Sequence, residues 1–410
     1  MGLSNVRGMR DLIGKDALLQ KKVENAFENV FTKYGYNPLY TPAVENFDLF
    51  KVKGAAGDAI KEEIYYFKDK SERELGLRFE FTASLARIAA TQQLRLPYKR
   101  YQIGEVYRYD RPQAKRYRAF NQADIDILGI SDLSAEIEVM KVIRDCFNSL
   151  KLKPRVIFNS RKLLNDLFNK FASGKEVEAM RILDKIDKIG KEAVIEMLNE
   201  ENIDTSVVDI ILENDIKKIT QVLGQSGGVK EINEFLEKCK ESNLDFVEFN
   251  ASLARGFDYY TGIVFEIKLD TGPSVGGGGR YDKLVKTYGG SDTPAVGIGL
   301  GVSRIFDYLK ENNAKNVING MFLVNLSKDT KKVNDFASSL REKDVICELD
   351  LKKFKLAKAF EYADNKGYRI VGILGDNELA ENKITIKNLI NGMQFQVEMN
   401  ADKIKELLTK

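Results

Sequence analysis

The chain has 410 residues, with 64 Lys and Arg, 61 Asp and Glu, three Cys, no Trp and no His. Without an imidazole it cannot build a Ser-His-Asp triad, a Cys-His pair, a His-ligated zinc site or an imidazole general base. Any catalysis must therefore use carboxylates, guanidinium groups, amides and phenols. The length favours two or three domains, and a net charge of +3 is too small to indicate a nucleic-acid partner by itself.

The spacing of the cysteines and the lengths of the apolar runs indicate the cellular compartment in which the protein is expected. Cys146, Cys239 and Cys347 form no Cys-x-x-Cys pair, which argues against a disulfide framework and against a thiolate metal site. The first residues lack a signal-peptide pattern, and Val6 occupies the position where a myristoylation motif has Ser or Thr. No apolar run approaches the ~20 residues of a membrane helix. We therefore expect a globular cytoplasmic protein with no membrane partner.

The first third of the chain combines one long helix with several strands. Apolar residues at three- and four-residue spacing predict an amphipathic helix over 17–34, and the prolines of 37–42 favour an extended edge or interface strand. A helix is expected near 84–94, and strand patterns lie around it at 64–67, 77–81, 101–109 and 120–128. Because short polar turns join these strands, we expect an antiparallel sheet rather than repeated βαβ units.

The composition then changes twice. Residues 160–243 are rich in Lys and Glu and apolar at helical spacing, and strand patterns resume at 246–250 and 263–269. We therefore interpret 160–243 as a helical insertion. From 320 onward strands and helices alternate and end in a hairpin at Asn391-Gly392, which predicts a compact α/β domain of about 90 residues.

A loop dense in arginine separates two of the expected strands. Residues 99–118 carry seven basic residues against two acidic ones, and Arg108, Arg116 and Arg118 are among them. A guanidinium group matches two oxygens of a phosphate or carboxylate at once, so the loop suits an anionic ligand. A charge run is also usual on a solvated face, so the loop alone leaves both interpretations open.

The strand after this loop alternates in polarity. Its period puts Gln122, Asp124 and Asp126 on one face and apolar residues on the other. An amide and carboxylates suit recognition of an ammonium group or a ring N–H on a small ligand. The alternative is a solvent-facing strand, and for Asp124 we favour that alternative.

Two later segments concentrate hydrogen-bonding groups and glycine. Residues 254–262 place Arg255, Tyr259 and Tyr260 just before a strand, although paired tyrosines are also common at the wet edge of a core. Residues 276–279 are four glycines without the Gly-Lys-Ser/Thr of a nucleotide P-loop. Such glycines let a ligand approach the backbone, and a flexible turn explains them equally well.

Taken in order, these segments resemble the motifs of class II aminoacyl-tRNA synthetases, and in particular the histidyl-tRNA synthetase family, over nearly the whole chain. Pro42 resembles the motif 1 proline, the loop 108–120 resembles motif 2, and 299–304 resembles motif 3. The segments with the more selective likeness to the histidyl family are 255–262 and 277–282, and segments 7–12 and 375–380 also fit that family.

The resemblance implies a class II synthetase fold, an α+β catalytic domain with an antiparallel sheet flanked by helices, over 1–318. The helical insertion at 160–243 would interrupt this domain, and an α/β anticodon-binding domain would cover 319–410. It also implies a homodimer, L-histidine, ATP and tRNA(His) as ligands, Mg²⁺ bound with ATP, and no metal site made of His or Cys.

The resemblance further assigns roles to matched positions. Arg108 and Arg255 would be catalytic, with Arg108 on the α-phosphate and the substrate carboxylate, and Arg255 where other class II enzymes place a metal ion. ATP would also be held by Arg116, Phe120 and Arg304. Histidine would be bound by Glu80, Thr82, Gln122, Asp126, Arg255, Tyr259 and Tyr260. The acceptor end of the tRNA would contact Gln113, Lys115 and Arg116.

The implied reaction needs no imidazole. An amino-acid carboxyl has a pKa of about 3.5 and is already ionised near neutral pH, so its attack on the α-phosphorus of ATP requires no general base. The step requires alignment of two anions and stabilisation of phosphoryl charge, which fixed guanidinium groups supply.

Three positions depart from the family pattern: Phe79 replaces a frequent Pro, Ser303 replaces an acidic residue, and Gly276 replaces a usual Ala.

Two other function classes stay open at this stage. A synthetase-like regulatory subunit of ATP phosphoribosyltransferase shares the fold but lacks the anticodon-binding domain and tends to lose the catalytic arginines. A general RNA-binding protein would use the basic loop and leave Gln122, Asp126 and the tyrosines unexplained. The absence of His adds a hypothesis: synthesis of such an enzyme would not stall when charged tRNA(His) is scarce.

Overall fold

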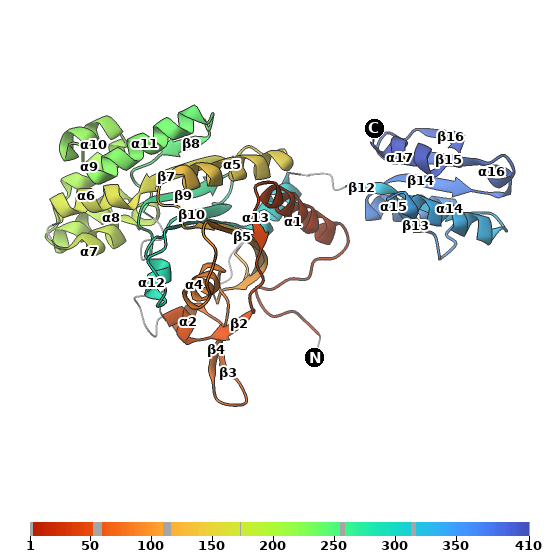
Figure 1. Cartoon of the computed structure of the whole chain (residues 1–410). Helices are drawn as coiled ribbons and strands as arrows, with labels where there is room; N and C mark the ends of the chain where they lie inside the picture. The colour runs from red at the N-terminus through yellow and green to blue at the C-terminus, as the bar shows by residue number, and fades with distance from the viewer. Residues whose placement is uncertain are drawn as a thin grey trace. The chain divides into compact units, whose positions relative to one another are not determined.

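The computed structural model describes residues 3–51, 60–109, 116–172, 174–254, 259–312 and 317–409. The chain divides into two compact units (Figure 1). The first comprises Met1–Asp11 and Lys22–Lys310, and the second comprises Leu12–Lys21 and Glu311–Lys410. The domain limits expected from the sequence, 1–318 and 319–410, remain a proposal.

The first unit is built on an eight-stranded sheet in the order β1-β5-β6-β11-β10-β9-β7-β8. The pairings from β5 to β7 along this order are antiparallel, and the edge strands β1 and β8 are parallel to their neighbours. The expected antiparallel sheet and the edge position of the proline-containing strand are therefore confirmed. The strands are β1 (Asn37–Pro38), β5 (Tyr98–Tyr107), β6 (Ala119–Leu128), β7 (Arg155–Ser160), β8 (Val247–Phe249), β9 (Ile263–Lys268), β10 (Gly276–Arg280) and β11 (Ala295–Leu300).

Aromatic side chains pack helices against this sheet. Phe27 of α1 (Lys15–Lys33) contacts Phe147 of α5 (Ser134–Ser149), with ring centroids 6.2 Å apart. Phe31 of the same helix contacts Tyr101 of β5, with centroids 5.7 Å apart. Both phenylalanines of α1 are fully buried, so the predicted amphipathic helix buries its apolar face.

The four consecutive glycines form β10, in the middle of the sheet between β9 and β11, so the flexible-turn interpretation is wrong. A Cβ atom added at Gly278 would lie 2.0 Å from the carbonyl oxygen of Gly297 on β11. Glycine therefore lets β10 approach its neighbour more closely than any side chain would allow.

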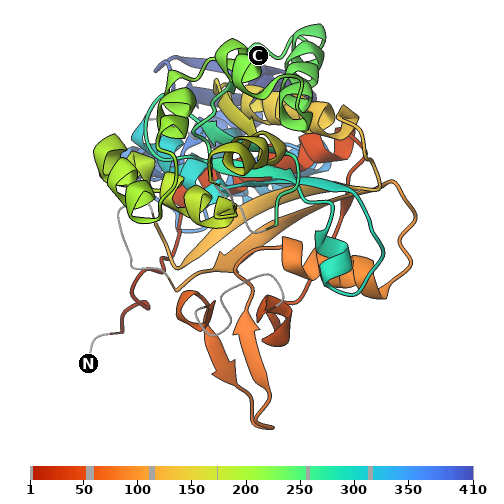
Figure 2. The same cartoon turned by 90° about the vertical axis from the view of Figure 1, so that its left-hand side faces the viewer.

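A small three-stranded sheet, β2-β4-β3, carries the strand pattern predicted near 64–67. Its strands are β2 (Val44–Asn46), β3 (Tyr66–Lys68) and β4 (Glu74–Leu77), and Figures 1 and 2 show β3 and β4 projecting away from the large sheet. The predicted strand over 77–81 is wrong because β4 ends at Leu77 and the chain turns into α4 (Thr82–Thr91). Short helices nearby are α2 (Asp48–Lys51), α3 (Ile60–Glu63) and α12 (Leu284–Thr287).

Residues 160–243 are helical, as their period predicts, and lie between β7 and β8. Figure 1 shows these helices gathered on one side of the large sheet. A Cβ atom added at Gly228 of α11 would lie 2.3 Å from the backbone nitrogen of Leu163 on α6, so glycine allows these two helices to pack closely. The helices are α6 (Arg161–Phe171), α7 (Glu176–Leu183), α8 (Ile186–Glu200), α9 (Ser206–Glu213), α10 (Ile216–Leu223) and α11 (Gly227–Glu241).

The second unit contains a five-stranded sheet in the order β13-β12-β14-β15-β16. Its strands are β12 (Ile318–Asn325), β13 (Ile346–Leu349), β14 (Tyr368–Leu374), β15 (Lys383–Asn388) and β16 (Gln394–Glu398). β12 is parallel to β13 and β14, and β15 and β16 form the predicted hairpin across Asn391-Gly392. Its helices are α14 (Thr330–Glu342), α15 (Leu356–Lys366), α16 (Asp376–Ala380) and α17 (Ala401–Thr409). No helix in the described part of the chain is long and apolar enough to cross a membrane.

Candidate active site

A cavity of about 460 Å³ lies over the middle strands of the large sheet. Its volume suits a small-molecule ligand. Arg255, Gln113 and Lys115 lie outside the described residues. All other predicted ligand-binding residues line this one cavity: Glu80, Thr82, Arg108, Arg116, Phe120, Gln122, Asp126, Tyr259, Tyr260 and Arg304.

The polar side chains of β6, Gln122, Asp124 and Asp126, form an acidic face inside the cavity. Asp124 and Asp126 are only 4% and 2% exposed, so the solvent-facing interpretation of Asp124 is wrong. The reason is the neighbouring strand β11, which has Gly297 opposite Asp126 and Gly299 opposite Asp124. A Cβ atom added at Gly297 would lie 1.9 Å from Asp126 Oδ1, so the carboxylate occupies the space that a side chain on β11 would fill.

A buried cation compensates this acidic face. Arg100 on β5 is fully buried and pairs in register with Asp126, and its Nη2 lies 2.5 Å from Asp126 Oδ2. The hydroxyl of Tyr281 donates a hydrogen bond to the other oxygen, Asp126 Oδ1. The neighbouring Asp124 accepts a hydrogen bond from Gln122 Nε2 at 2.7 Å. Burial raises the pKa of Asp124 to about 7; Arg100 opposes this shift and Asp126 adds to it.

Tyr259 and Tyr260, the tyrosine pair, line the cavity beside the acidic face. The Tyr259 hydroxyl donates to the Tyr260 hydroxyl at 3.1 Å, and the ring centroids are 4.4 Å apart. Burial raises the pKa of Tyr259, with a smaller contribution from the charge of Glu80. The Tyr259 phenol therefore stays protonated near neutral pH and remains a hydrogen-bond donor.

Glu80 and Thr82 lie where the chain enters α4. The Glu80 carboxylate accepts hydrogen bonds from the backbone N–H groups of Thr82 (2.7 Å) and Ala83 (2.8 Å), so it caps the first turn of the helix. Each carboxylate oxygen has a second lone pair and can accept a further donor from a ligand.

Two of the cavity's arginines, Arg108 and Arg304, donate hydrogen bonds to backbone carbonyl groups. Arg108 Nε donates to the carbonyl oxygen of Phe79 at 3.1 Å, and its guanidinium carbon lies 5.2 Å from the centroid of the Phe120 ring. Arg304 of α13 (Val302–Glu311) donates from Nη1 to the carbonyl oxygen of Ser274 at 2.5 Å. Two fixed guanidinium groups and an aromatic ring are suited to a ligand with phosphates and a planar base.

Sequence comparisons assign the family. The model of the histidyl-tRNA synthetase family matches residues 8–305, and the model of the anticodon binding domain matches residues 321–410. The chain belongs to the histidyl-tRNA synthetase family. The histidine–tRNA ligase of Sulfolobus acidocaldarius is 33% identical over 98% of this chain and 97% of its own length. That of Pyrococcus horikoshii is 30% identical over the full length of both chains.

Solved structures support the class II synthetase fold. The crystal structure of histidyl-tRNA synthetase from Nostoc sp. PCC 7120 matches 99% of this chain with a TM-score of 0.85 and 26% identity. An ATP phosphoribosyltransferase regulatory subunit/histidyl-tRNA synthetase from Bacillus halodurans matches 91% of the chain with a TM-score of 0.76. It is only 20% identical, so it supports the fold alone.

Two of the residues that depart from the histidyl-tRNA synthetase family pattern, Ser303 and Phe79, make hydrogen bonds in the structure. Ser303 is buried, and its Oγ accepts a hydrogen bond from the backbone N–H of Asn121 at 3.0 Å, so this hydroxyl holds the start of β6. Phe79 presents its carbonyl oxygen to Arg108, a contact that does not depend on the side chain.

The sequence reasoning missed several residues of the site. Glu266 is a buried carboxylate of β9 that lines the cavity opposite Gly277. A single Glu in the otherwise apolar pattern Ile-Val-Phe-Glu-Ile was the available signal. Arg100 was counted within the basic run 99–118, and only its register with Asp126 distinguishes it from a solvated charge.

Proposed function

We propose that this protein is a histidine–tRNA ligase, which activates L-histidine with ATP to histidyl-adenylate and diphosphate and then transfers histidine to the 3′ end of tRNA(His). The observation that carries the proposal is the combination of an acidic face and fixed arginines in one cavity of a histidyl-tRNA synthetase family member.

The side chains around the acidic face and the tyrosine pair suit the imidazole ring and the ammonium group of histidine. Asp126, fixed by Arg100 and Tyr281, would accept a hydrogen bond from a ring N–H, and Tyr260 would contact the other ring nitrogen. Glu80, Thr82 and Gln122 would bind the ammonium group, and Tyr259 would line the same pocket. A site built to hydrogen-bond its substrate leaves buried groups unpaired when an apolar analogue enters, which supports strong discrimination.

The arginine end of the cavity suits ATP. Arg108 would hold the α-phosphate beside the histidine carboxylate, Phe120 would stack on adenine, and Arg304 and Arg116 would contact the remaining phosphates. Arg255 would stabilise charge on the α-phosphate. These groups would align two anions and neutralise the phosphoryl oxygens, which is the main requirement of the activation step.

Mg²⁺ would enter with ATP. Magnesium in nucleotide sites uses one or two carboxylates together with the phosphates. No group of three or more His, Cys, Asp or Glu residues that could hold a metal ion occurs among the described residues, so they offer no all-protein metal cage. Glu266, a buried carboxylate of β9 that lines the cavity, fits this donor set and would hold the ion, which would neutralise phosphate charge.

The remaining assignments concern partners and organisation. We propose that 319–410 binds the anticodon, and that Gln113, Lys115 and Arg116 contact the acceptor end of tRNA(His). We further propose a cytoplasmic homodimer with Pro42 at the interface, a catalytic domain over 1–318, and a helical insertion domain at 160–243.

The test is ATP–diphosphate exchange with each amino acid in turn, followed by aminoacylation of tRNA. Histidine alone is expected to support exchange. Failure of every amino acid, with the protein folded, would contradict the ligase and favour the regulatory-subunit alternative.

A further inference from the structure

Two residues at the junction of β7 and α6, Asn159 and Arg161, hold the chain on either side of the tyrosine pair. Asn159 is fully buried, and its Nδ2 donates to the carbonyl oxygens of Ala251 (2.9 Å) and Leu253 (3.0 Å). Two residues later, the backbone N–H of Arg161 donates to the carbonyl oxygen of Gly262 at 2.8 Å. Leu253 lines the cavity, and Gly262 lies two residues after Tyr260, which also lines it.

Gly262 lies between two buried charged side chains. A Cβ atom added there would lie 3.0 Å from Cδ of Arg280 and 3.2 Å from Oε1 of Glu231. Thr261, next to the tyrosine pair, donates its backbone N–H to the carbonyl oxygen of Arg280 at 2.8 Å. On this side Gly262 therefore cannot shift far unless one of these charged groups moves.

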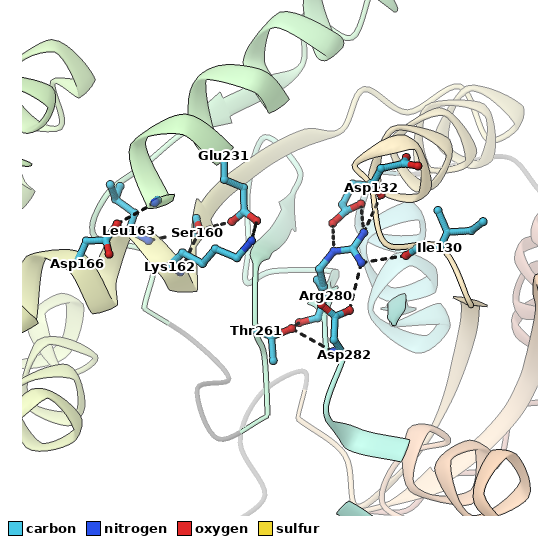
Figure 3. A network of polar contacts seen from close by, with 12 residues as sticks. Ile130, Asp132, Ser160, Lys162, Leu163, Asp166, Glu231, Thr261, Arg280 and Asp282 are labelled. Atoms are coloured by element: carbon cyan, nitrogen blue, oxygen red, sulfur yellow. Dashed lines mark hydrogen bonds and ion pairs between the residues drawn. The ribbon is translucent and has the colours of Figure 1, made fainter. Parts of the chain in front are cut away.

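The Arg280 side is rigid. Its guanidinium group makes a two-point contact with Glu136 of α5 at 2.6 and 2.7 Å. It also donates to the carbonyl oxygens of Ile130 (3.0 Å) and Asp132 (2.9 Å), as Figure 3 shows. With only 2% of its surface exposed, Arg280 is fixed by the sheet and by α5.

The Glu231 side belongs to the helical segment. Glu231 lies on α11, is 8% exposed, and accepts hydrogen bonds from the Ser160 hydroxyl and from Lys162 Nζ (2.7 Å) at the start of α6. Figure 3 shows Ser160, Lys162 and Glu231 converging at this point. Ser160 also accepts from the backbone N–H of Lys162, so the same residue caps α6. Of the two charged neighbours of Gly262, Glu231 is thus the one whose position depends on α11.

We propose that Asn159 and Glu231 are positioning residues for the tyrosine pair, and that Glu231 makes the geometry of the histidine pocket depend on the placement of α11. This inference rests on the proposed function, because it assigns the tyrosine pair to histidine. Gly262 is two residues from Tyr260, so a displacement of Gly262 moves the hydroxyl groups. A misplacement of about 1 Å can cost on the order of a hundredfold in rate.

The experiment compares Glu231→Ala and Asn159→Ala with Asp166→Ala as a matched control. Asp166 Oδ2 accepts from the backbone N–H of Gly228 at 2.8 Å, so it also joins α6 to α11, but it does so at Gly228 and not at Glu231. In the exchange assay both alanine variants are expected to raise the histidine KM by about tenfold while the ATP KM changes by less than about twofold. Glu231→Gln should recover part of the loss because its amide oxygen still accepts from Ser160.

Amide hydrogen exchange over 259–262 gives a readout that does not depend on activity. It should accelerate in Glu231→Ala and Asn159→Ala and stay near wild type in Asp166→Ala. If either alanine variant does not fold, Gly262→Ala replaces it and should raise the histidine KM with Glu231 in place.

Equal changes in Glu231→Ala and Asp166→Ala would overturn the proposal, because the effect would then come from loosened helix packing. An unchanged histidine KM and unchanged amide exchange in the alanine variants would also overturn it. A wild-type protein without histidine-dependent exchange would instead refute the ligase, and the hydrogen-exchange comparison would still decide the role of Glu231.

Discussion

Gly297→Ala is the most direct test of the acidic face. The added Cβ would lie 1.9 Å from Asp126 Oδ1 and 2.7 Å from its Cγ, so the carboxylate must leave its present position. Overpacking of this kind costs about 1–3 kcal/mol, and loss of a hydrogen bond to a charged group costs about 1.5–3 kcal/mol. If about 3 kcal/mol is lost from histidine binding in the transition state, kcat/KM for histidine falls on the order of a hundredfold.

The assay is histidine-dependent ATP–diphosphate exchange, with thermal unfolding measured in parallel. Gly104→Ala is the matched control, because it lies on β5 of the same sheet and its Cβ would lie 3.3 Å from Arg78 Nη2 and 3.8 Å from Phe81 Cζ, distances that need little or no movement. The control should retain kcat/KM within about threefold of wild type. A folded Gly297→Ala variant with a kcat/KM for histidine equal to wild type would refute the assignment of Asp126 to the substrate.

Three further predictions follow from the site and the composition. The raised pKa of Asp124 means that the folded state keeps a proton that the unfolded chain releases between about pH 4 and 7. Stability should therefore fall with rising pH across this window, by up to about 4 kcal/mol, and chemical denaturation of Asp124→Asn should show a flatter pH profile. Arg304→Ala should raise the ATP KM at least about tenfold and leave the histidine KM nearly unchanged, and a selective rise in the histidine KM would contradict its placement. Replacing several exposed residues with His should slow the recovery of cells from histidine starvation. Unchanged recovery would mean that the absence of His is a chance feature of the composition.

Local patterns in the sequence were sufficient for much of the site. The strand period of β6 put Gln122 and Asp126 on one face, and the cavity contains both. The arginine loop and the Tyr-Tyr segment each carry their signal within a few residues, so the residues that they supply could be named without knowledge of the fold. Their spacing says nothing about distance, however, and only the sheet order brings β6 and the tyrosine pair to one cavity.

Features that depend on a strand partner could not be predicted. Asp124 has the same local pattern in a solvent-facing strand and in a buried one, and the difference is Gly299 across the sheet. Arg100 lies in a basic run, and it is buried because β5 places it opposite Asp126. The strand pattern at 77–81 failed for a different reason: Glu80 caps α4, and this capping ends the extended conformation that its neighbours favour.

The cavity depends on glycines in β10 and β11 as much as on the ligand-binding side chains. Gly278 allows β10 and β11 to approach, while Gly297 and Gly299 leave the volume that the β6 side chains fill. A Cβ atom at Gly297 and the Asp126 carboxylate would occupy the same space, so the effects of the two substitutions on kcat/KM cannot be additive. Asp126→Ala removes the carboxylate that the new methyl group would strike, so adding Gly297→Ala to it should cost little more in kcat/KM. A double variant with the full sum of both losses would show instead that Gly297 supports the sheet independently of the acidic face.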